Sequence, residues 1–171
     1  MQHNRFPLLA FILAMVALPA CRASRTLEYT AAIDTAFTAD QMDEIAAAVD
    51  DWKASVPELR VTSTIAACDE PSAQQVCFHP VHAPPDPADD VVGTTHLSAN
   101  DSATVLIYVD RIQATGMNVH ALTQRTAAHE LGHAMGLHHT NAGTLMAAYV
   151  PDQAQEVTDA DVAQFWAVDG R

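Results

Sequence analysis

Residues 129–139 read HELGHAMGLHH, which contains the pattern His129-Glu130-x-x-His133-x-x-Gly136-x-x-His139. On a helix, His129 and His133 project from the same face one turn apart, so two ring nitrogens can bind one zinc ion at about 2.0–2.1 Å. Gly136 can adopt the left-handed conformation that ends a helix, and the turn brings His139 back as a third ligand. Because three protein ligands leave one position of a tetrahedral zinc open, the pattern predicts a catalytic site with one zinc ion.

Glu130 follows the first histidine of the pattern, where its carboxylate can reach a zinc-bound water but not the metal. We therefore expect Glu130 to act as a general base. The alternative is a polar helix face with two surface histidines, because short patterns of histidine and glutamate arise by chance. The glycine and the third histidine at fixed offsets favour the zinc site.

A methionine follows the histidines in residues 143–149, GTLMAAY. Together with the extended histidine pattern, it resembles the metzincin clan of zinc endopeptidases and their Met-turn. The resemblance implies that Met146 packs beneath the zinc as an apolar floor and is not a ligand. Tyr149 is a candidate for contacting the metal or the oxyanion, although it follows Met146 by three residues and not by the two seen in families with such a tyrosine. His138 adjoins the third ligand, but the offsets favour His139 as that ligand.

The N-terminal segment has the features of an export signal. Residues 6–18 are an almost unbroken apolar run that is too short to span a bilayer comfortably. The run ends in Leu18-Pro19-Ala20-Cys21, which resembles the lipobox of bacterial lipoproteins and implies a lipid on Cys21. The alternative is an ordinary secretory signal cleaved after Ala20 or Ala23. We expect a signal peptide over residues 1–20, a short tether over 21–26 and a catalytic domain over 27–171. The protein is then anchored at the cell envelope, or secreted if Cys21 carries no lipid.

The chain contains three cysteines. If Cys21 carries lipid, Cys68 and Cys77 remain as a pair, and an exported protein favours a disulfide between them. The alternative is two free thiols. Zinc binding by this pair is disfavoured, because Cys68 and Cys77 lack the close C-x-x-C spacing.

The formal net charge is −13. An acidic surface repels phosphate backbones, so we expect no nucleic-acid partner. A length of 171 residues with 49% apolar residues suits one domain with a sizeable core.

Hydrophobic patterns predict an α+β, or mixed α/β, fold. Strands are expected over residues 27–33, 59–65, 91–98 and 104–109, the last as a central strand buried on both faces. Helices are expected over residues 39–56, over 119–137 and from a cap at Thr158 onward; Thr38 and Gln41 form a capping box before the first of them. The proline-rich stretch of residues 68–90 is expected to be a loop.

This order of elements resembles the catalytic domain of the matrixins, a metzincin family, over about residues 27–171. The resemblance implies a twisted, mostly parallel sheet, a zinc-binding active-site helix and a C-terminal helix. It also implies an antiparallel edge strand that pairs with extended substrate, for which residues 91–98 match by position; the alternative is a plain sheet edge. Matrixins also carry a structural zinc and calcium ions, but the matching motif is absent between Phe78 and Asp101. The remaining acidic residues there favour a solvated loop over a calcium site: Asp86, Asp89 and Asp90.

The sequence as a whole predicts an exported zinc endopeptidase that hydrolyses peptide bonds with a zinc-activated water and Glu130 as the base. One alternative is a zinc hydrolase of cell-wall peptides, and another is a non-catalytic surface lipoprotein that uses the fold as a binding module. The intact histidine triad and Glu130 favour an enzyme. The expected partners are a protein or peptide substrate and the membrane, through Cys21. Too few residues precede the domain for a blocking pro-segment, so a separate protein inhibitor is a further candidate partner, and we expect a monomer.

Overall fold

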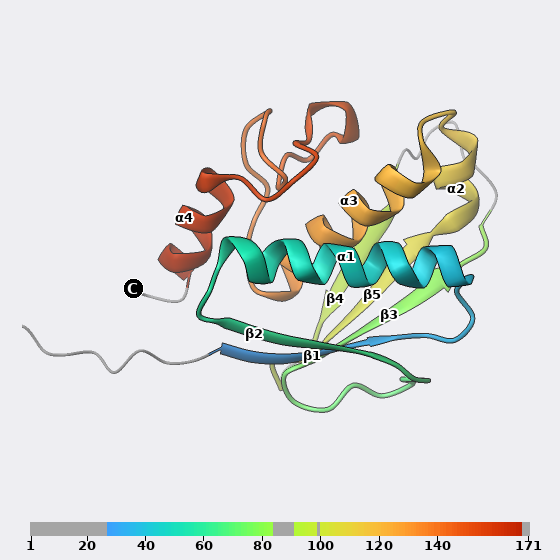
Figure 1. Ribbon diagram of the computed structural model, residues 1–171, viewed down its shortest axis with the longest axis horizontal. Helices are drawn as coiled ribbons and strands as arrows, with labels where there is room; N and C mark the ends of the chain where they lie inside the picture. Colours follow the sequence, from blue (N-terminus) through green and yellow to red (C-terminus); the bar gives the residue numbers. More distant parts are fainter. Residues whose placement is uncertain (1–26, 84–90, 99, 169–171) are drawn as a thin grey trace, which may run out of the picture.

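The structure is a computed structural model, and it describes residues 27–83, 91–98 and 100–168 (Figure 1). The expectations for the signal peptide, the tether and the lipid site at Cys21 lie outside the described residues. The acidic residues considered for calcium also lie outside them. No helix of the described part is long and apolar enough to cross a membrane.

A five-stranded sheet forms one layer of the domain, with strands in the order β2-β1-β3-β5-β4 (Figure 1). The strands are β1 (Leu27–Ile33), β2 (Leu59–Ile65), β3 (Gln75–Val81), β4 (Gly93–Leu97) and β5 (Ala103–Tyr108). All neighbours are parallel except β4 and β5, which are antiparallel. The expected mostly parallel sheet with an antiparallel edge strand is therefore confirmed.

The helices are α1 (Ala39–Ser55), α2 (Val109–Ala114), α3 (Val119–Ala134) and α4 (Asp159–Val168), with a 3-10 turn η1 (Val150–Asp152) before α4. The expected capping box begins α1: the Gln41 amide donates to Thr38 Oγ1 over 3.3 Å, and the Thr38 amide donates to Gln41 Oε1 over 3.0 Å. Helices α1 and α3 lie beside each other and share one core with the sheet (Figure 1). That core therefore lies between the sheet and these two helices.

Residues 75–81 form the strand β3, so the expectation of a loop there is wrong. The prolines of this stretch, Pro80 among them, indicated a loop, but residues 75–81 are a strand in which Val76, Cys77 and Phe78 are buried. Strand β3 pairs with β1 on one side and with β5 on the other. Tertiary pairing of this kind overrides the low strand propensity of proline, and Pro80 lies next to the last residue of the strand.

Three further features differ from the expectation: a short helix, the end of α3 and the burial of β5. Residues 109–114 form the short helix α2, which the sequence patterns did not indicate. Helix α3 ends at Ala134, before the expected residue 137, because the chain turns at Gly136 with a φ of +90°. Along β5, buried residues alternate with half-buried ones, so this strand is not buried on both faces.

A disulfide joins Cys68, which follows β2, to Cys77 on β3, with 5.8 Å between their Cα atoms. The expected disulfide is therefore present. Its two cysteines form a second, small buried cluster with Ala32 of β1. Because Ala31 and Ile33 point into the main core and side chains alternate along a strand, this cluster lies on the other face of the sheet.

Candidate metal centre

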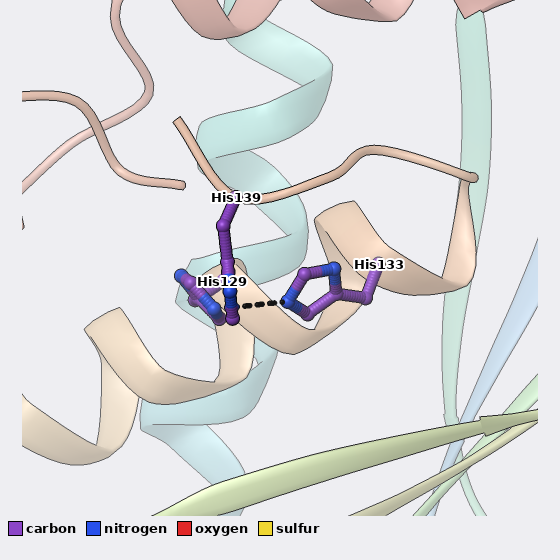
Figure 2. Close-up of side chains that lie close together, drawn as sticks. All are labelled: His129, His133 and His139. Atoms are coloured by element: carbon purple, nitrogen blue, oxygen red, sulfur yellow. Dashed lines mark hydrogen bonds between the residues drawn. The ribbon is translucent and has the colours of Figure 1, made fainter. Parts of the chain in front are cut away.

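Helix α3 presents the first two histidines of the motif from one face. Its first turn is capped by the Asn118 side chain, which accepts a hydrogen bond from the Ala121 amide over 3.3 Å. After the helix ends, the Leu137 amide donates to the Gly132 carbonyl over 3.0 Å, which closes the turn around Gly136. This turn leads the chain back over the helix, so that His139 lies beside the other two rings (Figure 2).

The three histidines place one nitrogen each within 4.8 Å of one another: His129, His133 and His139. The Nε2 atoms of His133 and His139 are 3.1 Å apart (Figure 2). Two nitrogens that bind one tetrahedral zinc at 2.0–2.1 Å lie about 3.3–3.4 Å from each other. The donor set and its spacing therefore fit a zinc ion. Among the described residues, this is the group of histidine, cysteine and acidic side chains that could hold a metal.

Backbone carbonyls fix the outer nitrogens of two of the rings. His129 Nδ1 lies 2.8 Å from the Leu145 carbonyl oxygen, and His133 Nδ1 lies 2.8 Å from the Leu137 carbonyl oxygen. A carbonyl oxygen only accepts, so each Nδ1 carries the hydrogen and each Nε2 keeps its lone pair. Such outer contacts set the tautomer and the direction of a metal-binding histidine.

Burial also keeps these two rings neutral. Burial lowers the pKa of His129 to about 4, and the hydrogen bond from its ring to the Leu145 carbonyl raises this pKa by a smaller amount. Burial likewise lowers the pKa of His133. Because a histidine must lose its proton to bind a metal, both rings are ready for binding at neutral pH.

Glu130 is buried beside the triad and is not a member of it. The hydroxyl of Thr95, on the edge strand β4, donates to Glu130 Oε2 over 2.6 Å. Burial raises the pKa of Glu130 to about 7, although the hydrogen bond from Thr95 lowers it. A carboxyl group with such a pKa can exchange a proton near neutral pH.

Met146 lies under α3 and is fully buried. A Cβ atom added at Gly132 would lie 2.5 Å from Met146 Sδ, so the methionine packs directly against the helix backbone between the two ligand positions. The structure therefore brings Met146 against α3 beside the ligand histidines.

Tyr149 and His138 lie at the rim of the site. Tyr149 is 55% exposed and lines a cavity of about 110 Å³ together with His129, Glu130 and His139. His138 is exposed and lines a cavity of about 410 Å³ on the side of Glu130 that faces β4. The ring of His138 is outside the triad.

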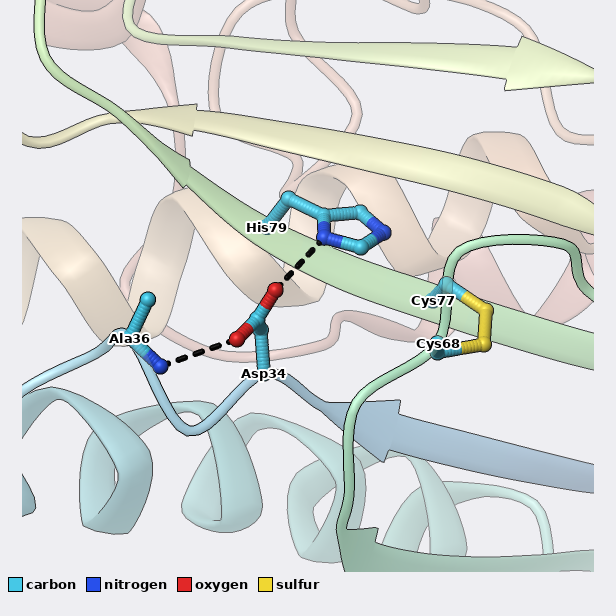
Figure 3. A network of polar contacts seen from close by, with 5 residues as sticks. All are labelled: Asp34, Ala36, Cys68, Cys77 and His79. Atoms are coloured by element: carbon cyan, nitrogen blue, oxygen red, sulfur yellow. Dashed lines mark hydrogen bonds and ion pairs between the residues drawn. A yellow bond between two sulfur atoms is a disulfide. The ribbon is translucent and has the colours of Figure 1, made fainter.

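The other described histidines lie apart from the triad. His79 is 2.9 Å from Asp34 (Figure 3), His82 is 3.1 Å from Asp110, and His120 is 3.2 Å from Glu44. His96 is exposed on β4. The first three of these histidines therefore have acidic partners away from the triad.

Three residues that support the site were missed by the sequence reasoning: Thr95, Gln153 and Asp161. Gln153 Nε2 donates to the Ala147 carbonyl over 3.0 Å and lies 3.1 Å from His129 Nδ1. The carboxylate of Asp161 accepts from the Leu145 and Met146 amides over 3.0 and 3.1 Å. Thr158-x-x-Asp161 has the form of a capping box, which signals a helix start but not this second contact. No local signal in the sequence indicated the contact of Thr95.

The family model described as matrixin matches residues 24–168. This chain belongs to the matrixin family. The match covers the whole described part of the chain, including the three histidines and Met146. Membership of this peptidase family, together with a histidine triad that could hold a metal ion, indicates a zinc metallopeptidase.

No curated protein matches the chain. Among solved structures, this matrixin is similar to a chain of the GM1-bound form of the ECX AB5 holotoxin. The two share 14% sequence identity with a TM-score of 0.47, and the match covers 85% of this chain and 72% of that one. A likeness of this size adds nothing to the family assignment, which rests on the matrixin match.

Proposed function

We propose that this matrixin is an exported zinc endopeptidase in which Glu130 is the general base. The observation that carries the proposal is the convergence of three histidine nitrogens within 4.8 Å, beside a buried glutamate. The outer nitrogens of His129 and His133 are held by carbonyls, so this convergence is organised before any metal binds.

In this proposal the three histidines bind the metal and Glu130 transfers the proton. His129, His133 and His139 would hold zinc, which supplies Lewis acidity that acidifies water and polarises a carbonyl oxygen. Glu130 accepts the proton of the attacking water at its carboxylate and then donates it to the leaving nitrogen of the peptide bond. In the metal-free protein, burial raises the pKa of Glu130 to about 7, so this carboxyl group takes up a proton more readily than an exposed glutamate.

The surroundings of Glu130 support a peptide as substrate. Glu130 lines two cavities, of about 110 Å³ and about 410 Å³. Two exposed apolar residues line the larger cavity: Leu97, the last residue of the antiparallel edge strand, and Val91, two residues before that strand. An extended peptide could add to this edge through main-chain hydrogen bonds, with its side chains entering the cavities.

The test is cleavage of casein by the soluble form beginning at Arg22, with zinc measured on each protein. We expect Glu130→Gln to lower kcat about 10²–10⁴-fold, because the base is lost while the three ligands remain. About one zinc per chain should stay bound in both proteins. Glu58→Gln is the matched control, because Glu58 is an exposed glutamate outside the site.

Two outcomes would overturn the proposal. An absence of zinc in the parent protein would exclude the metal centre. Bound zinc with no cleavage of casein would exclude a general endopeptidase and point to the narrower substrates of a cell-wall peptide hydrolase.

The proposal of export rests on residues 1–21 alone. If Cys21 carries lipid, Cys21→Ser should move the full-length protein from the membrane fraction to the soluble exported fraction. An unchanged distribution would show that the protein is secreted without an anchor or held by other means.

A further inference from the structure

The side chain of Glu130 is held by strand β4 as well as by its own helix. Thr95 Oγ1 lies 2.6 Å from Glu130 Oε2 and 3.0 Å from the Glu130 carbonyl oxygen. A hydroxyl has one hydrogen to donate, and a distance of 2.6 Å is typical of a bond to an ionised carboxylate. Oε1 takes no part in this contact and is available to accept a proton.

Gly93, on the same face of β4 as Thr95, also confines this carboxyl group. It stands two residues before Thr95 on β4, so both positions face α3. A Cβ atom at Gly93 would lie 2.8 Å from Glu130 Oε1 and 2.9 Å from Glu130 Cγ. Those distances are shorter than real Cβ contacts, so only glycine leaves room for this glutamate in its present place.

The register of β4 on β5 fixes where Thr95 and Gly93 lie along the axis of α3. In the antiparallel ladder between β4 and β5, Thr95 is the partner of Val105 and Gly93 is the partner of Ile107. Val105 and Ile107 are fully buried in the main core. A slip of one residue would turn Thr95 away from the helix, so core packing on β5 sets the position of the hydroxyl.

We propose that Thr95 is a positioning residue for the general base: its hydroxyl holds Glu130 Oε2 and thereby aims Oε1 at the reacting water. This inference rests on the proposed function, because it assigns a role in that reaction. Proton transfer depends on a heavy-atom distance of about 2.6–3.2 Å, and a displacement of about 1 Å at a catalytic group can lower a rate about 100-fold. A single hydrogen bond that removes the rotational freedom of Glu130 can therefore control kcat.

The test compares Thr95→Val, which keeps the shape and removes the hydroxyl, with Thr95→Ser, which keeps the hydroxyl. We expect Thr95→Val to lower kcat about 10–100-fold with KM within about threefold of the parent, because this hydroxyl already donates its one hydrogen to Glu130. Thr95→Ser should restore kcat to within about threefold of the parent. Thr104→Val, on the neighbouring strand and the opposite face, is the matched control and should leave both constants unchanged. Thr95→Ala replaces the valine variant if that protein does not fold.

Crystal structures of metal-free Thr95→Val and Thr95→Ser give a second readout that needs no activity. We expect the Glu130 carboxyl group to leave its present place in the valine variant and to keep it in the serine variant. An unmoved Glu130 in Thr95→Val, or equal losses of kcat in the serine and valine variants, would overturn the inference. If the parent cleaves no peptide, the proposed function fails, while the two crystal structures still decide whether Thr95 positions Glu130.

Discussion

At the scale of single residues, the buried carboxylate of Asp161 organises the underside of the site. Its two oxygens accept from the Leu145, Met146 and Thr158 amides over 3.0, 3.1 and 2.9 Å. The Thr158 hydroxyl donates to the same carboxylate over 2.6 Å. The carbonyl of Leu145 in turn holds His129 Nδ1, so the first turn of α4 is linked through the Met-turn to a ligand histidine.

We predict that Asp161→Ala lowers the free energy of unfolding by at least about 3 kcal/mol, because it leaves several buried donors without an acceptor. Zinc affinity should fall about 10–100-fold, since the support of His129 is loosened. Urea unfolding and zinc titration measure the two effects. Asp159→Ala removes an exposed carboxylate from the same helical turn and should cost no more than about 1 kcal/mol. A similar small cost for Asp161→Ala would contradict this account.

At the scale of the elements, α3 is placed by α1 from one side and by the Met-turn from below. Trp52 of α1 is fully buried, and its Nε1 donates to the Ala128 carbonyl over 2.8 Å. A Cβ atom at Gly132 would lie 3.2 Å from Trp52 Cζ2 and 2.5 Å from Met146 Sδ. Glycine at this position therefore allows three elements to approach one another directly under the ligand histidines.

We predict that Gly132→Ala destabilises the protein by about 1–3 kcal/mol through overpacking. In an unobstructed helix the same substitution stabilises by about 1 kcal/mol, so the sign distinguishes close packing from helix propensity. Urea unfolding of Gly132→Ala, Met146→Ala and the double variant forms a thermodynamic cycle. Gly132→Ala should lower the free energy of unfolding by less in the Met146→Ala protein than in the parent, because the thioether is absent there. Stabilisation by Gly132→Ala alone would show that the contact with Met146 is loose.

At the scale of the whole molecule, Asp34 and His79 link the end of β1 to the neighbouring central strand β3 (Figure 3). Asp34 follows β1, and its Oδ1 accepts from the Ala36 amide over 2.9 Å. His79 lies on β3, and its Nδ1 is 2.9 Å from Asp34 Oδ2. The hydrogen bond from the Ala36 amide, and after it the contact with His79, lower the pKa of Asp34.

We predict that Asp34→Asn destabilises the metal-free protein by about 1 kcal/mol at pH 7 and by less in acid. The pKa of Asp34 is lower in the folded protein than in the unfolded chain, where it is about 4. The charged carboxylate therefore stabilises the fold fully above about pH 4. This stabilisation is lost as the pH falls through the pKa of the folded protein. Urea unfolding from pH 7 to pH 3 measures the difference between parent and variant. Asp69→Asn, at an exposed position after β2, should differ from the parent by no more than about 0.5 kcal/mol. A difference for Asp34→Asn that stays constant down to pH 3 would contradict the assignment.

Much of the fold was predictable because many of its signals are local. The capping box at Thr38 lies within four residues, and β1 and β2 were expected over the ranges that the structure has. Strand β3 was missed because Pro80 resembles a loop residue, while the pairing partners that make it a strand lie on β1 and β5. The sequence of residues 75–81 contains no signal that indicates this pairing.

The sequence by itself determined the histidine triad, its metal-ready spacing and the glutamate beside it, because residues 129–139 span one helix end and one turn, whose geometry is local. It also indicated the pairing of Cys68 with Cys77. Only the tertiary structure decided that Thr95 holds Glu130, that Asp161 supports the Met-turn and that Gly132 admits Met146. Each of these contacts joins segments from different elements, and sheet register and helix packing, which set them, depend on the whole buried core.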